Sequence, residues 1–241
     1  MHPIEQFKIH TLIPIHIFGV DISITNASVV MLLACLLCIG LPYLALIRKG
    51  KLLALLELSF ELVTDTMQQY AHDTRYFSFI FSIFIFVLLA NMLGIIPHVH
   101  TATSHIIVTL SMACIVYMSI LIMGLTQKGW KFFRIFLPTS VPLYLAPLFI
   151  PIEIISFLSK PFSMAIRLFA NMVAGHVVLK IFAGFVISML GLNWFIKPLA
   201  ILPLAMNSIM TCFEIAVAFI QAYVFTILAC IYISEMLGDE H

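Results

Sequence analysis

The chain has 241 residues, of which 63% are hydrophobic and only 10% are charged, and its formal net charge at pH 7 is +1. So few charges exclude a water-soluble domain with a polar surface, and the near-neutral balance excludes the basic footprint of a nucleic-acid-binding protein. We therefore expect an all-α integral membrane protein, a single membrane domain whose partners lie in or at a lipid bilayer.

The first membrane span is expected close to the N-terminus. Residues 1–25 contain no basic stretch leading into an apolar core and a cleavage site, so they predict an outer N-terminal segment and not a cleaved signal peptide. Residues 26–47 are apolar over the roughly 20 residues that a helix needs to cross a bilayer. Residues 77–125 hold two more such stretches around a polar loop and predict a two-helix hairpin.

The segment 52–74, between the first two spans, has a different pattern. Its acidic and amide side chains recur every three or four residues, with leucine and phenylalanine on the other face. These polar residues are Glu57, Glu61, Asp65 and Gln68. The pattern predicts an amphipathic helix lying on the inner membrane surface. An ordinary solvated helix is the alternative, and the two neighbouring spans disfavour it.

The C-terminal part of the chain contains two longer apolar stretches, 138–190 and about 199–234. Each exceeds a single perpendicular crossing, so each must tilt, bend or lie partly along the bilayer. The short sequence GLNWFIKP separates them, and we expect an antiparallel hairpin of tilted helices over 138–234. The chain then has about five membrane helices.

Basic residues in the connections set the expected orientation. One side of the membrane collects Arg48, Lys49, Lys51, Arg75, Lys128, Lys131 and Arg134, and the other side has Lys8 and Lys197. Because cytoplasmic or matrix loops carry the excess of Lys and Arg, the first side should be the inner one. With five spans, the N-terminus is outside and the C-terminus is inside.

Ionisable residues at membrane depth are costly, and here they gather in the last two segments. On a helical wheel one polar stripe lies within about 40° of Arg167. It consists of Glu153, Ser156, Lys160, Ser163, Arg167 and Asn171. Inter-helix hydrogen bonding explains the serines and the asparagine but does not require a permanent charge, so we favour a hydrated pathway.

The last segment carries a second polar stripe, because Asn207, Glu214 and Gln221 recur at seven-residue intervals. A hairpin that turns near residue 195 places His176 at the depth of Glu214, and Arg167 at the depth of Gln221. Arg167 then separates an outer set of polar groups from an inner set. His176 points away from the Arg167 face, so the outer pathway must pass between the helices.

Three stretches resemble subunit a of F-type ATP synthases, the stator subunit beside a rotating ring: RLFANMVAGH, LPTSVPLYLAPLFIPIEIIS and EIAVAFIQAYVFTILACIYIS. The resemblance extends from the first span to the last. It implies a cofactor-free role in proton translocation, in a subunit that is not an enzyme by itself. It also implies that Arg167 is the partner of the rotor carboxylate and the barrier to protons, and that Gln221 is its neighbour on the last helix.

The resemblance and the two stripes together predict two offset half-channels. The outer one uses His176, Glu214, Asn171, Gln221 and Asn207, and the inner one uses Glu153, Ser156 and Ser163. The implied partners are a rotor ring of small carboxylate-bearing hairpin subunits, the membrane subunits of a peripheral stalk and lipid, with no nucleic acid. The implied location is the bacterial inner membrane or the mitochondrial inner membrane.

Other functions have weaker support in the sequence. A stand-alone proton-coupled secondary transporter should show paired repeats and a closed midplane site, and an intramembrane enzyme should show a nucleophile with its base or a metal motif. The sequence shows neither pattern. The outer-loop histidines His98, His100 and His105 have no acid or thiol nearby to complete a metal site, so we expect no metal. Asn91 either orients channel water or makes an interhelical hydrogen bond.

Overall fold

The computed structural model of the chain describes residues 11–13, 16–17, 20–21, 23–70, 75–96, 105–129, 145–191 and 197–237. Nearly all of them are helical, and five helices are long and apolar enough to cross a membrane. This confirms the predicted all-α membrane fold. The helices are α1 (Asn26–Arg48), α2 (Lys51–Tyr70), α3 (Phe77–Ile95), α4 (Ile106–Lys128), α5 (Ala146–Leu190) and α6 (Ile201–Leu237), the last preceded by the 3₁₀ turn η5 (Lys197–Ala200).

Four short strands before α1 were not predicted from the sequence. They form two antiparallel pairs, in which the first strand pairs with the fourth and the second with the third. Strands of two or three residues are too short to show an alternating pattern, so hydropathy gives no signal for them. The strands are β1 (Thr11–Ile13), β2 (His16–Ile17), β3 (Val20–Asp21) and β4 (Ile24–Thr25).

Local signals define both ends of α1. The helix begins with a capping box, in which the backbone N–H of Thr25 donates to Ser28 Oγ at 2.8 Å and the Ser28 N–H donates to Thr25 Oγ1 at 3.4 Å. Its last residue is Arg48, and the C-cap residue Lys49 adopts the left-handed conformation with φ of 37°. Gly50 follows, and α2 begins at the next residue, so the chain changes direction within two residues.

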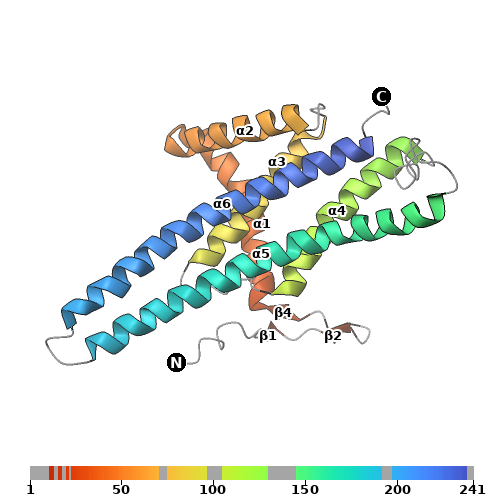
Figure 1. The fold of residues 1–241 in the computed structure, drawn as a ribbon. Coiled ribbons are helices and arrows are strands. Elements are labelled where there is room, and N and C mark those ends of the chain that lie inside the picture. Colours follow the sequence, from red (N-terminus) through yellow and green to blue (C-terminus); the bar gives the residue numbers. More distant parts are fainter. Residues whose placement is uncertain are drawn as a thin grey trace.

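The helices form a bundle with a slanted pair laid across it (Figure 1). Helices α5 and α6 run side by side in opposite directions and cross α1, α3 and α4 obliquely. The predicted tilted hairpin is therefore confirmed. Its first helix begins at Ala146, and residues 138–144 of the predicted stretch lie outside the described residues. The short strands and α2 lie at opposite ends of the bundle, and the last turns of α6 lie at the α2 end.

Helix α2 is amphipathic, as predicted. Its four polar residues at spacings of three and four are exposed, whereas Val63, Thr66 and Met67 are buried against the bundle. The helix ends at Tyr70, and residues 71–74 of the predicted segment lie outside the described residues. Its buried residues place one face of α2 on the bundle and leave the acidic face outward.

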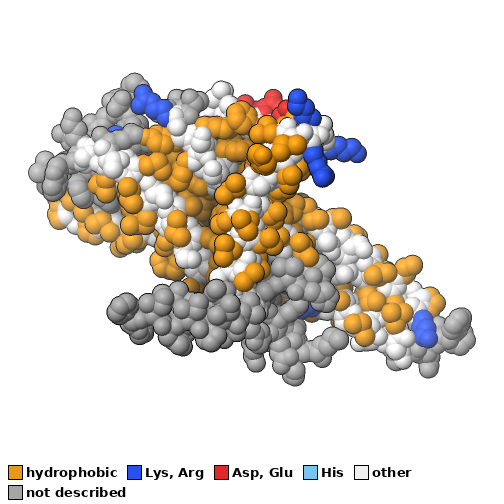
Figure 2. Space-filling view, turned by 180° about the vertical axis from the view of Figure 1, so that it is seen from behind, with side chains coloured by type: hydrophobic (Ala, Val, Ile, Leu, Met, Phe, Trp, Pro, Cys, Tyr) orange, Lys and Arg blue, Asp and Glu red, His pale blue; other side chains and the backbone are white. Residues whose placement is uncertain are grey.

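The core lies where α3 and α6 cross, and it also receives side chains from α4. Phe84 of α3 meets Phe219 of α6 edge to face, with 6.0 Å between ring centroids and an interplanar angle of 89°. Apolar side chains cover the middle of the outer surface, and lysine and arginine side chains lie toward its ends (Figure 2). An apolar belt between charged ends fits a bundle whose surrounding solvent is lipid.

Candidate functional site

The polar stripe around Arg167 lies on one unbroken helix, because α5 runs from Ala146 to Leu190 without interruption. Arg167, Ser156 and Ser163 are exposed, and Glu153 is half-buried. Large apolar side chains are exposed beside the stripe, among them Ile155, Ile166 and Phe162. Arg167 therefore sits on the outer surface of the protein within an otherwise apolar region.

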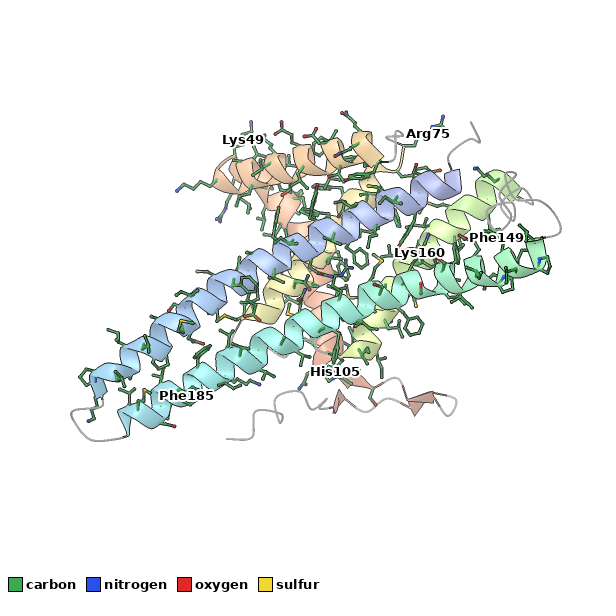
Figure 3. The ribbon with its side chains drawn as sticks, in the orientation of Figure 1. Lys49, Arg75, His105, Phe149, Lys160 and Phe185 are labelled. Carbon is green, nitrogen blue, oxygen red and sulfur yellow. The ribbon has the colours of Figure 1, made fainter. Side chains whose placement is uncertain are left out.

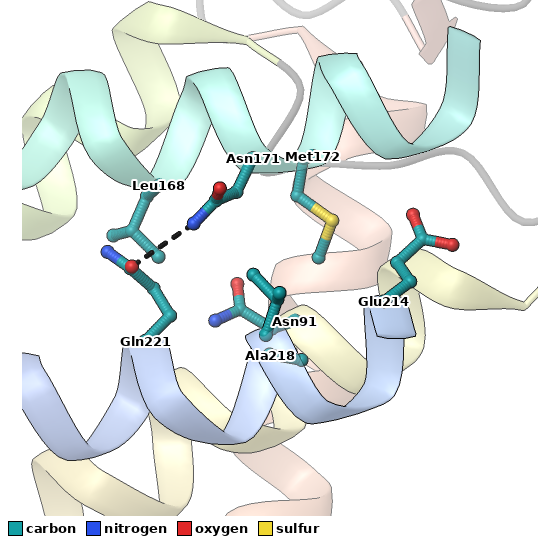
Figure 4. A pocket seen from close by; sticks show the side chains of 8 residues that line it. Asn91, Leu168, Asn171, Met172, Glu214, Ala218 and Gln221 are labelled. Carbon is teal, nitrogen blue, oxygen red and sulfur yellow. Dashed lines mark hydrogen bonds between the residues drawn. The ribbon is translucent and has the colours of Figure 1, made fainter. Parts of the chain in front are cut away.

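One turn after Arg167, the hairpin is fixed by a hydrogen bond between its two helices. The side-chain N–H of Asn171 donates to Gln221 Oε1 at 3.2 Å (Figure 4). Gln221 is only 5% exposed whereas Asn171 is exposed, so this partly buried bond lies at the edge of the seam between α5 and α6. The register that pairs Asn171 with Gln221 is within about one turn of the register predicted from the sequence, which paired Arg167 with Gln221.

Glu214 lies at the same seam, about two turns before Gln221 on α6. It is 7% exposed and packs against Gly175 of α5. A Cβ atom placed on Gly175 would lie 3.0 Å from Glu214 Cδ and would clash with Glu214 Oε1. The absence of a side chain at position 175 is therefore what allows the carboxyl group to enter the helix interface.

A water-sized cavity joins the polar groups of this seam (Figure 4). Its volume is about 20 Å³, which meets the size needed to hold one water molecule. Asn91 Oδ1 and both carboxyl oxygens of Glu214 are buried and have no hydrogen-bond partner among the described residues. The cavity has both the volume and the polar groups that a bound water requires. Its lining residues are Asn91, Leu168, Asn171, Met172, Glu214, Val217, Ala218 and Gln221.

A second cavity of about 130 Å³ adjoins the same seam. Asn171, Glu214 and Val217 line both cavities, so Glu214 borders each of them. The other lining residues are small or apolar: Ala174, Gly175, Val178, Met210 and Phe213. Together the two cavities give a chain of small spaces along the α5–α6 interface, with polar groups at Glu214, Asn171 and Gln221.

Two predicted residues of the outer pathway lie away from these cavities. His176 is half-buried and hydrogen-bonds the backbone of Gly94 in α3, consistent with its predicted position off the Arg167 face. Asn207 is half-buried on α6, and its backbone carbonyl accepts the Thr211 hydroxyl at 2.9 Å. The structure therefore gathers Glu214, Asn171 and Gln221 in one place, and it leaves His176 and Asn207 outside the cavity linings.

Asn91 is the residue of this site that the sequence left undecided. It is 2% exposed on α3 and lines the smaller cavity opposite Asn171 and Glu214. The available signal was a single amide in an apolar span, which is equally typical of a hydrogen bond between helices. Only the crossing of α3 with α6 shows which helix interface it enters.

The histidines His98, His100 and His105 precede α4 in the sequence. His98 and His100 lie outside the described residues, and His105 lies just before α4 at the strand end of the bundle, opposite Lys49 and Arg75 (Figure 3). Partial burial lowers the pKa of His105. Within the described ranges, no three His, Cys, Asp or Glu side chains come close enough together to hold a metal ion.

Comparison with known proteins agrees with this architecture. The family described as ATP synthase A chain matches residues 23–234. ATP synthase subunit a of Afipia carboxidovorans is 44% identical over 99% of both chains, and that of Nitrobacter hamburgensis is 45% identical over the full length of both. ATP synthase subunit a of Beijerinckia indica is 46% identical over 99% of this chain and 97% of its own. The chain therefore belongs to the family of ATP synthase subunit a.

Proposed function

We propose that the chain is the proton-translocating stator subunit of a rotary F-type ATP synthase, with two half-channels separated by Arg167. One observation carries the proposal. Arg167 is exposed on the apolar outer face of α5, and one turn away Asn171 borders a water-sized cavity that it shares with Glu214 and Gln221. A fixed charge facing outward next to a polar cavity is the arrangement that loading and unloading of a passing carboxylate requires.

The chemistry follows from the cost of charge in lipid. A bare carboxylate in hydrocarbon is heavily penalised, so a rotor carboxylate must carry a proton while it faces lipid. The guanidinium of Arg167 stays charged and stabilises the ionised carboxylate only while the two are adjacent. The carboxylate therefore releases its proton on one side of Arg167 and takes up another on the other side.

The polar residues divide between two routes in this proposal. Protons from outside reach the rotor through His176, Glu214, Asn207, Asn171 and Gln221, and protons leave inward past Ser163, Ser156 and Glu153. The positive charge of Arg167 repels a proton in transit and so prevents a continuous proton wire between the routes. The burial of Glu214 and its place in the lining of both cavities support its role as a relay.

The partners and orientation follow from the exposed surfaces. The apolar face of α5 around Arg167 would meet a rotor ring of carboxylate-bearing hairpins, and membrane subunits of a peripheral stalk would complete the stator. The end of the bundle that carries Lys49, α2 and Arg75 would face the cytoplasm or matrix (Figure 3). The membrane is a bacterial inner membrane or a mitochondrial inner membrane, with the N-terminus outside.

Glu214→Gln should slow proton translocation by about an order of magnitude or more, because the amide keeps the shape of the carboxyl group but cannot pass on a proton. The complex should still assemble. ATP-driven proton pumping in inverted membrane vesicles measures the effect across a range of pH. Cys212→Ser is the matched control, since Cys212 lies two residues away and is exposed on another face of α6. Pumping equal to that of the unaltered protein at every pH would remove Glu214 from the path.

Cysteines at positions 153 and 156 should react with hydrophilic thiol reagents supplied from the inner side. The five native cysteines are first replaced, and Glu153→Cys and Ser156→Cys are then introduced one at a time. Ile155→Cys is the control, because Ile155 is exposed but belongs to the apolar surface beside the stripe. Reaction at positions 153 and 156 without reaction at 155 is the expected result. Protection of all three positions in active membranes would show that the inner stripe is packed and dry.

A further inference from the structure

The inward half of α5 contacts two other helices at a single turn, residues 157–161. Phe157 and Pro161 of α5 are both buried there. Tyr117 of α4 is 4% exposed and Tyr232 of α6 is 5% exposed. The Tyr117 ring lies 4.8 Å from the Phe157 ring and meets the Tyr232 ring edge to face at 5.6 Å, so three helices converge on one aromatic cluster.

Pro161 leaves a backbone group in this turn without its usual partner. In a regular α-helix the carbonyl of residue 157 accepts the N–H of residue 161, and proline has no N–H. The hydroxyl of Tyr117 donates to the Phe157 carbonyl oxygen at 2.9 Å. An unpaired carbonyl at membrane depth is costly, because lipid offers no donor. Tyr117 therefore supplies from α4 a hydrogen bond to the carbonyl that residue 161 cannot pair with.

The same turn carries a charge of the polar stripe. Lys160 Nζ lies 4.7 Å from the centroid of the Tyr232 ring, a cation–π distance, so α6 holds the ammonium group in place (Figure 3). Lys160 is seven residues from both Glu153 and Arg167, or about 10 Å along the helix in each direction. A movement of this turn would shift the whole inner half of the stripe relative to Arg167.

We infer that Tyr117 is a positioning residue for proton translocation. Its hydroxyl donates to the Phe157 carbonyl oxygen in place of the N–H that Pro161 lacks, and this bond fixes the position of the inner half of the polar stripe relative to Arg167. The functional part of this inference rests on the proposed function. The hydrogen bond from Tyr117 to the Phe157 carbonyl does not depend on the proposed function, and the experiment tests the bond and the functional role separately.

The test is a double-mutant cycle in the assembled complex. Tyr117→Phe removes only the hydroxyl, and Pro161→Ala restores the N–H that pairs with the Phe157 carbonyl. Tyr117→Phe alone should lower the unfolding midpoint of the purified complex, change the reaction rate of Ser156→Cys with a hydrophilic thiol reagent about three- to twentyfold, and reduce ATP synthesis. In the Pro161→Ala background, Tyr117→Phe should change each of these measurements by less than about twofold.

Pro151→Ala is the matched control. It also restores an N–H inside α5, but Pro151 and Pro147, whose carbonyl that N–H would pair with, are both exposed. Pro151→Ala should therefore leave the effect of Tyr117→Phe unchanged. If Tyr117→Phe does not assemble, restored assembly in the Tyr117→Phe/Pro161→Ala variant is the supporting result.

Equal effects of Tyr117→Phe with and without Pro161→Ala, or equal suppression by Pro151→Ala, would overturn the inference and assign Tyr117 to ring packing alone. Failure of both Tyr117→Phe and the double variant to assemble would overturn it as well. If the proposed function is wrong, Pro161→Ala should still suppress the effect of Tyr117→Phe on the unfolding midpoint. The thiol reaction rate and ATP synthesis should then show no such suppression.

Discussion

Replacing Arg167 by alanine should abolish ATP synthesis driven by proton flow while leaving the complex assembled. Without the guanidinium, a rotor carboxylate gains nothing by ionising beside the stator, so proton exchange stops. The block between the half-channels is also lost, so protons should leak through the membrane sector. Arg167 is exposed, so its removal opens no cavity in the bundle.

Arg167→Lys distinguishes charge from shape. Lysine keeps one positive charge but lacks the planar fork of arginine, and its ammonium can lose its proton when desolvated. We expect no proton-driven synthesis from this variant and a smaller leak than from Arg167→Ala. Proton flux through membranes stripped of the catalytic head measures the leak in both variants. Arg75→Ala is the control, because it removes an equal charge at the α2 end of the bundle (Figure 3).

Sustained proton-driven ATP synthesis by Arg167→Ala would remove Arg167 from the mechanism. Loss of assembly in Arg167→Ala, with normal assembly of Arg75→Ala, would show instead that the main role of Arg167 is structural.

Gly175→Val should reduce ATP synthesis by more than about tenfold, because even a Cβ at this position collides with the Glu214 carboxyl group. The collision should push Glu214 out of the α5–α6 seam and change the lining of the two cavities that it borders. Gly184→Val is the matched control, since a Cβ on Gly184 of the same helix meets nothing within 4 Å. Proton pumping and assembly are measured for both variants. Equal activity of the two valine variants would contradict the close fit of Gly175 against Glu214.

The sequence predicts the large features of this fold because each depends on a long, strong pattern. Spans such as 26–47 are predicted from runs of about 20 apolar residues. Few structures other than a membrane helix require such a run. The hairpin register follows from a turn expected near residue 195, and the Asn171–Gln221 bond lies within about a turn of it. The identities of the path residues, Arg167 among them, remain predictions.

Contacts between helices distant in sequence could not be predicted. The pairing of Tyr117 with the Phe157 carbonyl joins residues 40 positions apart, and a tyrosine in an apolar span gives no sign of its partner. The fit of Gly175 against Glu214 could not be predicted either, because a glycine in a membrane helix is equally suited to close approach to another subunit. Such contacts depend on crossing angles, and hydropathy does not encode those angles.

Under the proposed function, the length of α5 determines how a rotor ring can turn against it. Its 45 residues extend about 68 Å, more than twice the hydrocarbon thickness of about 30 Å, so a helix held within the bilayer must lean more than about 60° from the normal. Successive turns then differ more in lateral position than in depth. Under the proposed function, the outer and inner routes open at different points on the circumference of the ring. The direction of the lean, and no single side chain, then decides whether inward proton flow drives the ring clockwise or anticlockwise.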